Sequence, residues 1–215
     1  KFELVLVGHW IFERQRPHQS SHSSTHRPPL PPFYPASPPF VKMSFVVSKR
    51  LSLAMADEIA TVAIRTAERH SFKPISVCIL DPSGFEIVTK RMDDSPPMLF
   101  PKISRAKANT CVSTKQSSRS YGVKYLKDKE GNPAPSDTFS RGLNQIATAG
   151  GDVAAFPGGV LIRDKESGDI VGAIGVSGAA GDEDEFCALM GVQDSSVGEI
   201  LATEPAEHSC KTLKA

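Results

Sequence analysis

The sequence has no apolar run that approaches the roughly 20 residues of a membrane-spanning helix, so no membrane segment is predicted. It has no excess of charge either, with 25 lysines and arginines against 24 aspartates and glutamates, a net of +1. Nucleic-acid binding usually requires a clustered basic face, which this balance does not indicate. The 215 residues suffice for one substantial domain.

Cysteine pairs at metal-ligand spacing are also missing. The four cysteines are far apart in the sequence, at Cys78, Cys111, Cys187 and Cys210. No CxxC pair occurs, so neither a zinc site nor a thioredoxin-like motif is predicted. Wide spacing is typical of reduced, buried thiols in an intracellular protein, and we therefore predict a cytoplasmic location.

Histidine is scarce within the part of the sequence that has the pattern of a folded domain. Four of the six histidines lie before residue 42 and His208 lies near the end, which leaves His70. A zinc cage, a histidine triad or a Cys–His dyad is therefore not predicted. His70 is interpreted as a helix C-terminal residue, with a metal or haem ligand as the alternative.

Residues 1–42 differ in composition from the rest of the chain. Eight of the 17 prolines lie between Pro17 and Pro39. Proline locks φ and lacks a hydrogen-bond donor, so we predict a disordered or polyproline-like extension. Met43 is interpreted as lying near the natural start. The alternative is an organelle transit segment, because the stretch contains arginine and serine and is poor in acids.

From Leu53 onwards the hydrophobic pattern predicts helices and hairpins within one domain, residues 43–202, followed by a C-terminal tail, residues 203–215. Residues 170–176 are predicted as the last strand. Hairpins make antiparallel pairs, which indicates an α+β layer fold and not a doubly wound parallel sheet. The other predicted elements are strands at 75–80, 85–91 and 160–162 and helices at 53–69, 102–114, 117–126, 137–147 and 183–190.

The most distinctive stretch is the glycine-rich run at 171–181. Gly172, Gly175 and Gly178 suggest a dinucleotide loop, but they lie within and at the end of a strand, without a crossover unit and a ribose-binding acid. No nucleotide cofactor is therefore predicted. Two interpretations stay open: the glycines permit close packing of a strand, or the turn after Ser177 binds a ligand at a helix start.

Four consecutive acids follow at 182–185. Consecutive residues on a helix point in different directions, so these acids cannot all bind one metal ion. Asp182 and Glu185 have the spacing of a capping box, which predicts that they begin a helix. One of the acids could still contact a ligand or weakly bound iron.

Basic side chains could present a cationic edge to the carboxylates of a ligand. The candidates are Arg91, Lys102, Arg105 and Lys107. The alternative is that they are ordinary solvated charges, with Arg91 paired weakly to Asp93 or Asp94.

Several motifs together resemble the GlcG/HbpS-like family, also called the haem-degrading family. They are SVCILDPSG at 76–84, RMD at 91–93, AKA at 106–108, FPGGV at 156–160, VGAIGVSG at 171–178, and Asp184-Glu185 with Cys187-Ala188. Their order and spacing match over residues 51–190.

The resemblance implies a profilin-like, three-layer α+β fold, in which helices sandwich an antiparallel sheet of about five strands. It also implies a homo-oligomer that binds haem or a related tetrapyrrole, and it indicates no particular axial ligand. We expect the ligand contacts to come from Arg91, Lys107, Pro157, Gly158, Gly159, Ser177, Gly178 and Asp184.

Three functional hypotheses follow. The first is a binding protein for haem or a similar flat, anionic ligand, with Arg91 or Lys107 facing the propionates. The second is an enzyme or accessory factor for a small hydroxy or keto acid such as glycolate, with the same cationic site. The third is a structural oligomer, in which glycines such as Gly175 allow close packing of subunits.

Overall fold

The computed structural model describes residues 5–7, 10–12, 48–128 and 130–213, and the chain divides into two units, 1–45 and 46–215. In the first unit, β1 (Val5–Val7) pairs antiparallel with β2 (Trp10–Phe12). Both are short runs of β-branched, leucine and aromatic residues, which favour strands. These two strands differ from the disorder that is predicted for residues 1–42. For the other residues of that stretch, the prediction lies outside the described residues.

The second unit is built around one antiparallel sheet of five strands. They are β3 (Ser76–Leu80), β4 (Glu86–Arg91), β5 (Gly159–Asp164), β6 (Ile170–Ser177) and β7 (Leu201–Glu204). Their order across the sheet is β4-β3-β6-β5-β7. The predicted α+β fold, with an antiparallel sheet of about five strands, is confirmed.

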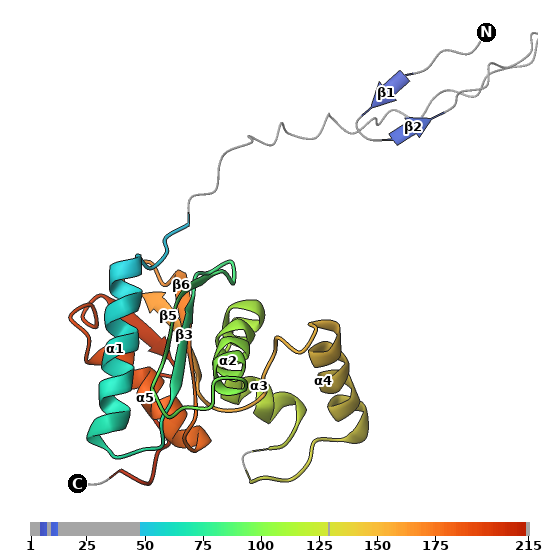
Figure 1. Ribbon diagram of the computed structural model, residues 1–215. Helices are drawn as coiled ribbons and strands as arrows, with labels where there is room; N and C mark the ends of the chain where they lie inside the picture. The colour runs from blue at the N-terminus through green and yellow to red at the C-terminus, as the bar shows by residue number, and fades with distance from the viewer. Residues whose placement is uncertain (1–4, 8–9, 13–47, 129, 214–215) are drawn as a thin grey trace, which may run out of the picture. The chain divides into compact units, whose positions relative to one another are not determined.

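Helices cover both faces of this sheet (Figure 1). The helices are α1 (Leu53–Arg69), α2 (Phe100–Thr114), α3 (Ser118–Tyr125), α4 (Ser136–Thr148) and α5 (Gly181–Gln193). Helices α1 and α5 pack on one face, and α2 packs on the other. Among the described residues, no helix is both long and apolar enough to cross a membrane.

Strand β3 shows why the sequences of the central strands are continuous apolar runs. Val77 and Ile79 belong to the core beneath α1 and α5, whereas Cys78 and Leu80 belong to the core beneath α2. Successive strand residues point to opposite faces, so a strand that is covered on both sides needs apolar residues at every position. All five residues of β3 are buried.

Helix α1 has the bounds that its periodicity predicts. The hydroxyl of Ser52 caps it by accepting a hydrogen bond from the Met55 amide at 3.3 Å. Its small residues allow close packing against α5: a Cβ on Gly191 would lie 2.9 Å from the Cβ of Ala63. Alanine on one helix and glycine on the other therefore set the short distance between these helices.

The prediction that residues 170–176 form the last strand is wrong, because β7 follows. It pairs with β5 at the edge of the sheet, with Leu161 opposite Glu204 and Asp164 opposite Leu201. Of its four residues only Leu201 is buried, so the strand carries no clear alternating pattern. The predicted domain end at residue 202 falls inside β7.

The start of α5 also differs from the prediction. Ala180 is the N-cap, and the carboxylate of Glu183 reaches back to accept a hydrogen bond from the Ala180 amide at 3.0 Å. The predicted capping pair of Asp182 and Glu185 is therefore wrong. Their carboxylates instead bind a guanidinium from another helix, that of Arg119.

Helix α4 packs on α3. The Tyr121 hydroxyl donates to Oε1 of Gln145 at 2.9 Å, and Gly142 lies so close to Tyr125 that a Cβ would be 2.7 Å from the Tyr125 Cβ. Phe139 and Leu143 on α4 are exposed. Both helices lie on the α2 side of the sheet (Figure 1).

Candidate functional site

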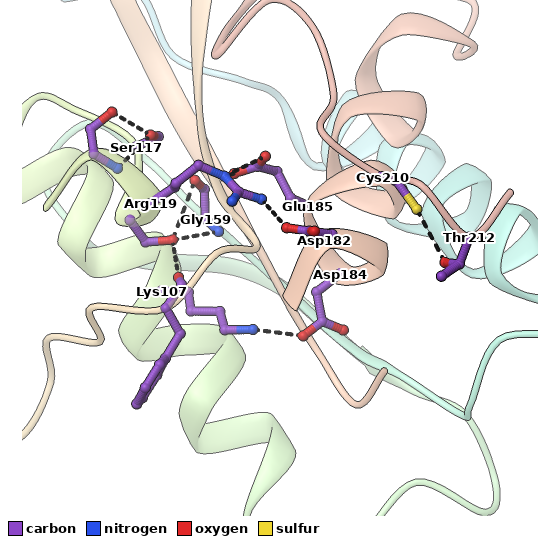
Figure 2. A network of polar contacts seen from close by, with 12 residues as sticks. Lys107, Ser117, Arg119, Gly159, Asp182, Asp184, Glu185, Cys210 and Thr212 are labelled. Carbon is purple, nitrogen blue, oxygen red and sulfur yellow. Dashed lines mark hydrogen bonds and ion pairs between the residues drawn. The ribbon is translucent and has the colours of Figure 1, made fainter. Parts of the chain in front are cut away.

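A buried ion pair joins α2 to α5 across the end of β6 (Figure 2). Nζ of Lys107 donates to Oδ2 of Asp184 at 2.7 Å and to the carbonyl oxygen of Val176 at 2.7 Å. Both charged side chains are only 3% exposed. The second carboxylate oxygen of Asp184 accepts a hydrogen bond from the Ala179 amide at 2.9 Å. The pair therefore has charge-assisted partners on both sides.

Gly158 makes room for this pair. Its φ of +118° lies in the region that favours glycine. A Cβ there would lie 2.9 Å from Nζ of Lys107, 2.9 Å from the Cβ of Asp184 and 2.6 Å from the Val176 carbonyl oxygen. The structure thus brings together three of the predicted site residues, Lys107, Gly158 and Asp184.

Burial favours the neutral form of both side chains, Lys107 and Asp184. It lowers the pKa of Lys107 below its ordinary value, against the opposing effect of the Asp184 carboxylate. It raises the pKa of Asp184 to about 6, against the opposing effect of Lys107. The pair is therefore costly to desolvate, and each partner depends on the other.

The raised pKa of Asp184 predicts a pH dependence of stability. Between about pH 6 and the ordinary carboxyl pKa near 4, the folded state binds more protons at this group than the unfolded chain does. The contribution of Asp184 to the free energy of unfolding therefore rises as pH falls through this window. Urea unfolding of the unmutated protein and of Asp184→Asn at pH 7 and pH 5 measures it. We expect the unmutated protein to gain stability relative to the variant; equal changes would contradict the prediction.

A second network adjoins this pair and joins α3 to the first turn of α5 (Figure 2). Nε of Arg119 donates to both carboxylate oxygens of Glu185, at 2.9 and 3.0 Å, and its Nη2 donates to Asp182 at 2.5 Å. The Glu185 side chain is fully buried. Burial raises the pKa of Glu185, with Arg119 opposing the shift.

Sequence reasoning missed Arg119. It lies in the polar stretch from Ser117 to Ser120, which carries no apolar or motif signal. Only the fold reveals its role, because its partners Asp182 and Glu185 lie more than 60 positions later in the chain. The nearest signal in the sequence is the run of acids itself, which needs a counter-charge if part of it is buried.

The other predicted glycines approach backbone of the same chain. A Cβ on Gly159 would meet the carbonyl oxygen of Lys107, and the Gly159 amide donates to the Ser118 hydroxyl at 2.8 Å. A Cβ on Gly178, whose φ is +148°, would meet the carbonyl oxygen of Pro74. These contacts favour the close-packing interpretation of the glycine-rich run over the ligand-binding one.

Pro157 and Ser177 lie at the same end of the sheet. Ser177 ends β6 opposite Ser76 of β3. Pro157 lies beside the start of α5, where a Cβ on Gly181 would be 3.3 Å from the Pro157 ring. Pro157 directly precedes Gly158 and thus adjoins the ion pair.

Arg91 is exposed at the end of the edge strand β4. Its Nη1 donates to the carbonyl oxygens of Met92, Asp93 and Ser95 at 3.1, 2.8 and 2.7 Å. The guanidinium therefore holds the loop that follows its own strand, instead of pairing with the neighbouring aspartate side chains.

The basic side chains that were predicted to form one cationic edge have different surroundings in the structure. Arg105 pairs with Glu86 at 3.7 Å and with Asp152 at 3.4 Å, Lys107 is buried, and Lys102 is exposed. These residues do not act as one surface toward an anion. Because Lys107 already binds Asp184, the contact between α2 and α5 does not fit the propionates of a tetrapyrrole.

Metal-binding groups were sought in the described part of the chain. No cluster there of three or more histidine, cysteine, aspartate or glutamate side chains is arranged to hold a metal ion. The four cysteines are free and buried. Burial raises the pKa of Cys78 to about 11, with the Thr89 hydrogen bond opposing the shift. Buried, protonated thiols of this kind are poor metal ligands.

A different cluster of side chains lies around Phe186 on α5. We call it the Phe186 cluster; it consists of His70, Phe72, Phe186 and His208. The Phe186 ring centroid lies 5.2 Å from His70, 6.3 Å from Phe72 and 4.8 Å from His208, with interplanar angles of 84°, 78° and 82°. His70 also stacks on Phe72 at 5.5 Å. The two histidines that follow residue 42 are therefore brought onto one aromatic side chain.

Solved structures share this fold. The Klebsiella pneumoniae protein ORFY matches with a TM-score of 0.58 and 20% identity, covering 70% of this chain and 94% of its own. A PduOC–haem complex matches with a TM-score of 0.56 and 23% identity, covering 69% and 97%. A double mutant of Streptomyces reticuli HbpS matches with a TM-score of 0.53 and 25% identity, covering 73% and 96%. At the lower two identities the likeness concerns the fold alone.

A search of curated proteins found no match. A family model described as haem degrading protein HbpS-like matches residues 51–193, which include the sheet strands β3 to β6, the Lys107–Asp184 pair and most of the Phe186 cluster. This confirms the family resemblance of the motifs. The chain belongs to the HbpS-like family.

Proposed function

We propose that this protein binds haem or a related tetrapyrrole. The observation that carries the proposal is the family match over residues 51–193, which spans α1 to α5. A structural relative, PduOC, has been crystallised as a haem complex, which supports the same ligand class. Haem would supply an iron with free axial positions, a flat apolar ring and two carboxylates.

Two of those three features, the iron and the flat ring, have matching groups in the Phe186 cluster. Its phenyl rings are aromatic groups of the kind that line ligand sites, with Phe186 buried and Phe72 half-buried. Its imidazoles are common ligands of haem iron. The Lys107–Asp184 pair offers haem neither an iron ligand nor a partner for its carboxylates, because both charges are buried and bound to each other. Ligand contacts at the eight residues expected from the sequence stay a prediction.

Haem titration of the full-length chain tests the proposal. We expect haemin to give a shifted Soret band that saturates near one haem per chain at micromolar concentrations, because an enclosed iron exchanges solvent for a protein ligand. Iron-free protoporphyrin IX, followed by fluorescence, separates recognition of the ring from ligation of the iron. The absence of any change with both probes would overturn the proposal.

The homo-oligomer and the cytoplasmic location also stay predictions. Light scattering of the full-length chain measures the first. A single-chain mass at concentrations where haem binds would contradict an oligomeric binding protein.

A further inference from the structure

We propose that an open cleft at the start of α1 binds a small carboxylate with an apolar body, such as a medium-chain fatty acid. The cleft lies between the residues that lead into α1 and the turn that joins β3 to β4, at one end of the sheet (Figure 1). It has a volume of about 500 Å³, which is within the range of small-molecule sites. The inference goes beyond the proposed function, because no side chain of the Phe186 cluster lines the cleft and the ligand belongs to a different class.

Apolar side chains line the cleft on both sides. On the α1 side they are Leu51, which is 3% exposed, and Leu53, which is 63% exposed. On the β4 side they are Phe85, which is 72% exposed, and the half-buried Ile87. An apolar ligand that lies between Leu53 and Phe85 removes both side chains from water, which favours binding.

The backbone on each side of the cleft is fixed before a ligand arrives. On one side, the Leu51 amide donates to the carbonyl oxygen of Val171 in β6 at 3.1 Å. On the other side, Oδ1 of Asp81 accepts hydrogen bonds from the amides of Ser83 and Phe85, at 2.8 and 3.0 Å. The two sides therefore need little reordering on binding, which lowers its entropic cost.

Arg50 gives the cleft a positive charge. Its side chain is exposed and lines the cleft. In the described part of the chain Arg50 forms no ion pair, whereas its neighbour Lys49 pairs with Asp164 at 2.5 Å. The Arg50 guanidinium is therefore available to a carboxylate, which it can bind with two parallel hydrogen bonds.

The two acidic residues of the lining have other partners. Asp81 holds the turn between β3 and β4 through its hydrogen bonds to backbone amides. The Glu86 carboxylate lies 3.7 Å from the Arg105 guanidinium of α2, and it also accepts a hydrogen bond from the Cys78 thiol at 4.0 Å. Both contacts of Glu86 lie on the α2 face of the sheet, opposite to α1, so its charge is turned away from the cleft.

A cation beside apolar walls selects a ligand that has both a carboxylate and an apolar body. Acetate would use the arginine alone, and an alkyl ammonium ion would use the walls alone and meet the arginine with a like charge. Octanoate has both groups. It is therefore the probe that separates this cleft from a nonspecific anion site or a nonspecific apolar surface.

The test compares four full-length proteins by isothermal titration calorimetry with octanoate. They are the unmutated chain, Arg50→Gln, Phe85→Ser and, as the control for loss of an exposed arginine on α1 outside the cleft, Arg65→Gln. We expect Arg50→Gln and Phe85→Ser each to weaken octanoate binding at least about fivefold, since each removes one of the two attractions. Arg65→Gln should change it less than about twofold. Both exposed cleft residues can be replaced without a loss of core packing.

Two further measurements locate and define the site. Backbone amide shifts on octanoate addition should be largest at residues 50–53 and 85–87, and acetate and octylammonium should bind much more weakly than octanoate. Absence of octanoate binding, equal binding by all four proteins, or equal binding of octylammonium would overturn the inference. Haemin binding should be unchanged in Arg50→Gln. Displacement of octanoate by haemin would also overturn the inference, because it would show one shared site, whereas failure of haemin to bind concerns the proposed function alone.

Discussion

Replacing Gly175 with alanine is expected to prevent stable folding. Gly175 lies in the central strand β6, opposite Cys78 in β3 and Gly159 in β5. A Cβ at this position would overlap the carbonyl oxygen of Ser104 and lie 2.7 Å from the Ala108 amide nitrogen. Both obstacles are backbone atoms of α2, so no rotamer change relieves them. Overpacking costs roughly 1–3 kcal/mol where side chains can adjust, and we expect more than about 3 kcal/mol here.

Gly151→Ala is the matched control for this measurement. Gly151 has a positive φ, +81°, which Gly175 does not have, and a Cβ there meets no atom within 4 Å. Its replacement should cost only the backbone strain, about 1–2 kcal/mol. Urea unfolding followed by circular dichroism compares the two. Equal losses would show that α2 does not pack against β6 as closely as the structure has it.

This experiment also bears on the third hypothesis from the sequence, in which Gly175 serves contacts between subunits. The helix that Gly175 contacts belongs to its own chain. We therefore expect Gly175→Ala to lower the stability of each chain. A variant that stays folded but changes only its state of association would favour the subunit-contact role.

The second large effect is expected from breaking the Lys107–Asp184 pair. Lys107→Met leaves the Asp184 carboxylate buried without its counter-charge. Asp184→Asn should cost less, because burial already favours the neutral form of the Asp184 side chain. Removing one partner of a buried pair costs about 3–5 kcal/mol. The double variant Lys107→Met, Asp184→Asn removes both charges, so its loss should be smaller than the sum of the two single losses by at least about 1 kcal/mol.

The exposed pair of Asp137 and Arg141 on α4 provides the control. Its side chains are 76% and 62% exposed and lie 3.5 Å apart. Asp137→Asn should change the free energy of unfolding by less than about 0.5 kcal/mol, because water screens the pair. Additive losses in the Lys107–Asp184 cycle would contradict a direct coupling between these side chains.

Much of the fold could be predicted because its signals are local. The periodicity of α1, the turn between β3 and β4 and the apolar runs of β5 and β6 each depend on neighbours in the sequence, and the structure has these elements close to the predicted bounds. The motifs also identified the family. The short edge strand β7 was not predicted, because one buried residue in four gives no periodic signal in the sequence.

The candidate site was predicted only in part. Lys107, Gly158 and Asp184 do lie together, and the structure has a buried ion pair in a close-packed junction there. The sequence left open whether the glycine-rich turn permits close packing or binds a ligand. Arg119 was missed, and His208 was set aside because of its place near the C-terminus. No local pattern links either residue to the partners that it meets in space.

The sequence by itself determined the layer fold, its family and the scarcity of histidine and cysteine ligands, because these depend on composition and short-range order. Only the tertiary structure decided which charges are buried together and which rings meet. Lys107 and Asp184 are 77 positions apart, and His208 reaches Phe186 only because the C-terminal segment folds back along α5. Burial and proximity across such separations arise from packing of the whole sheet and its helices, and they in turn set the pKa of Asp184.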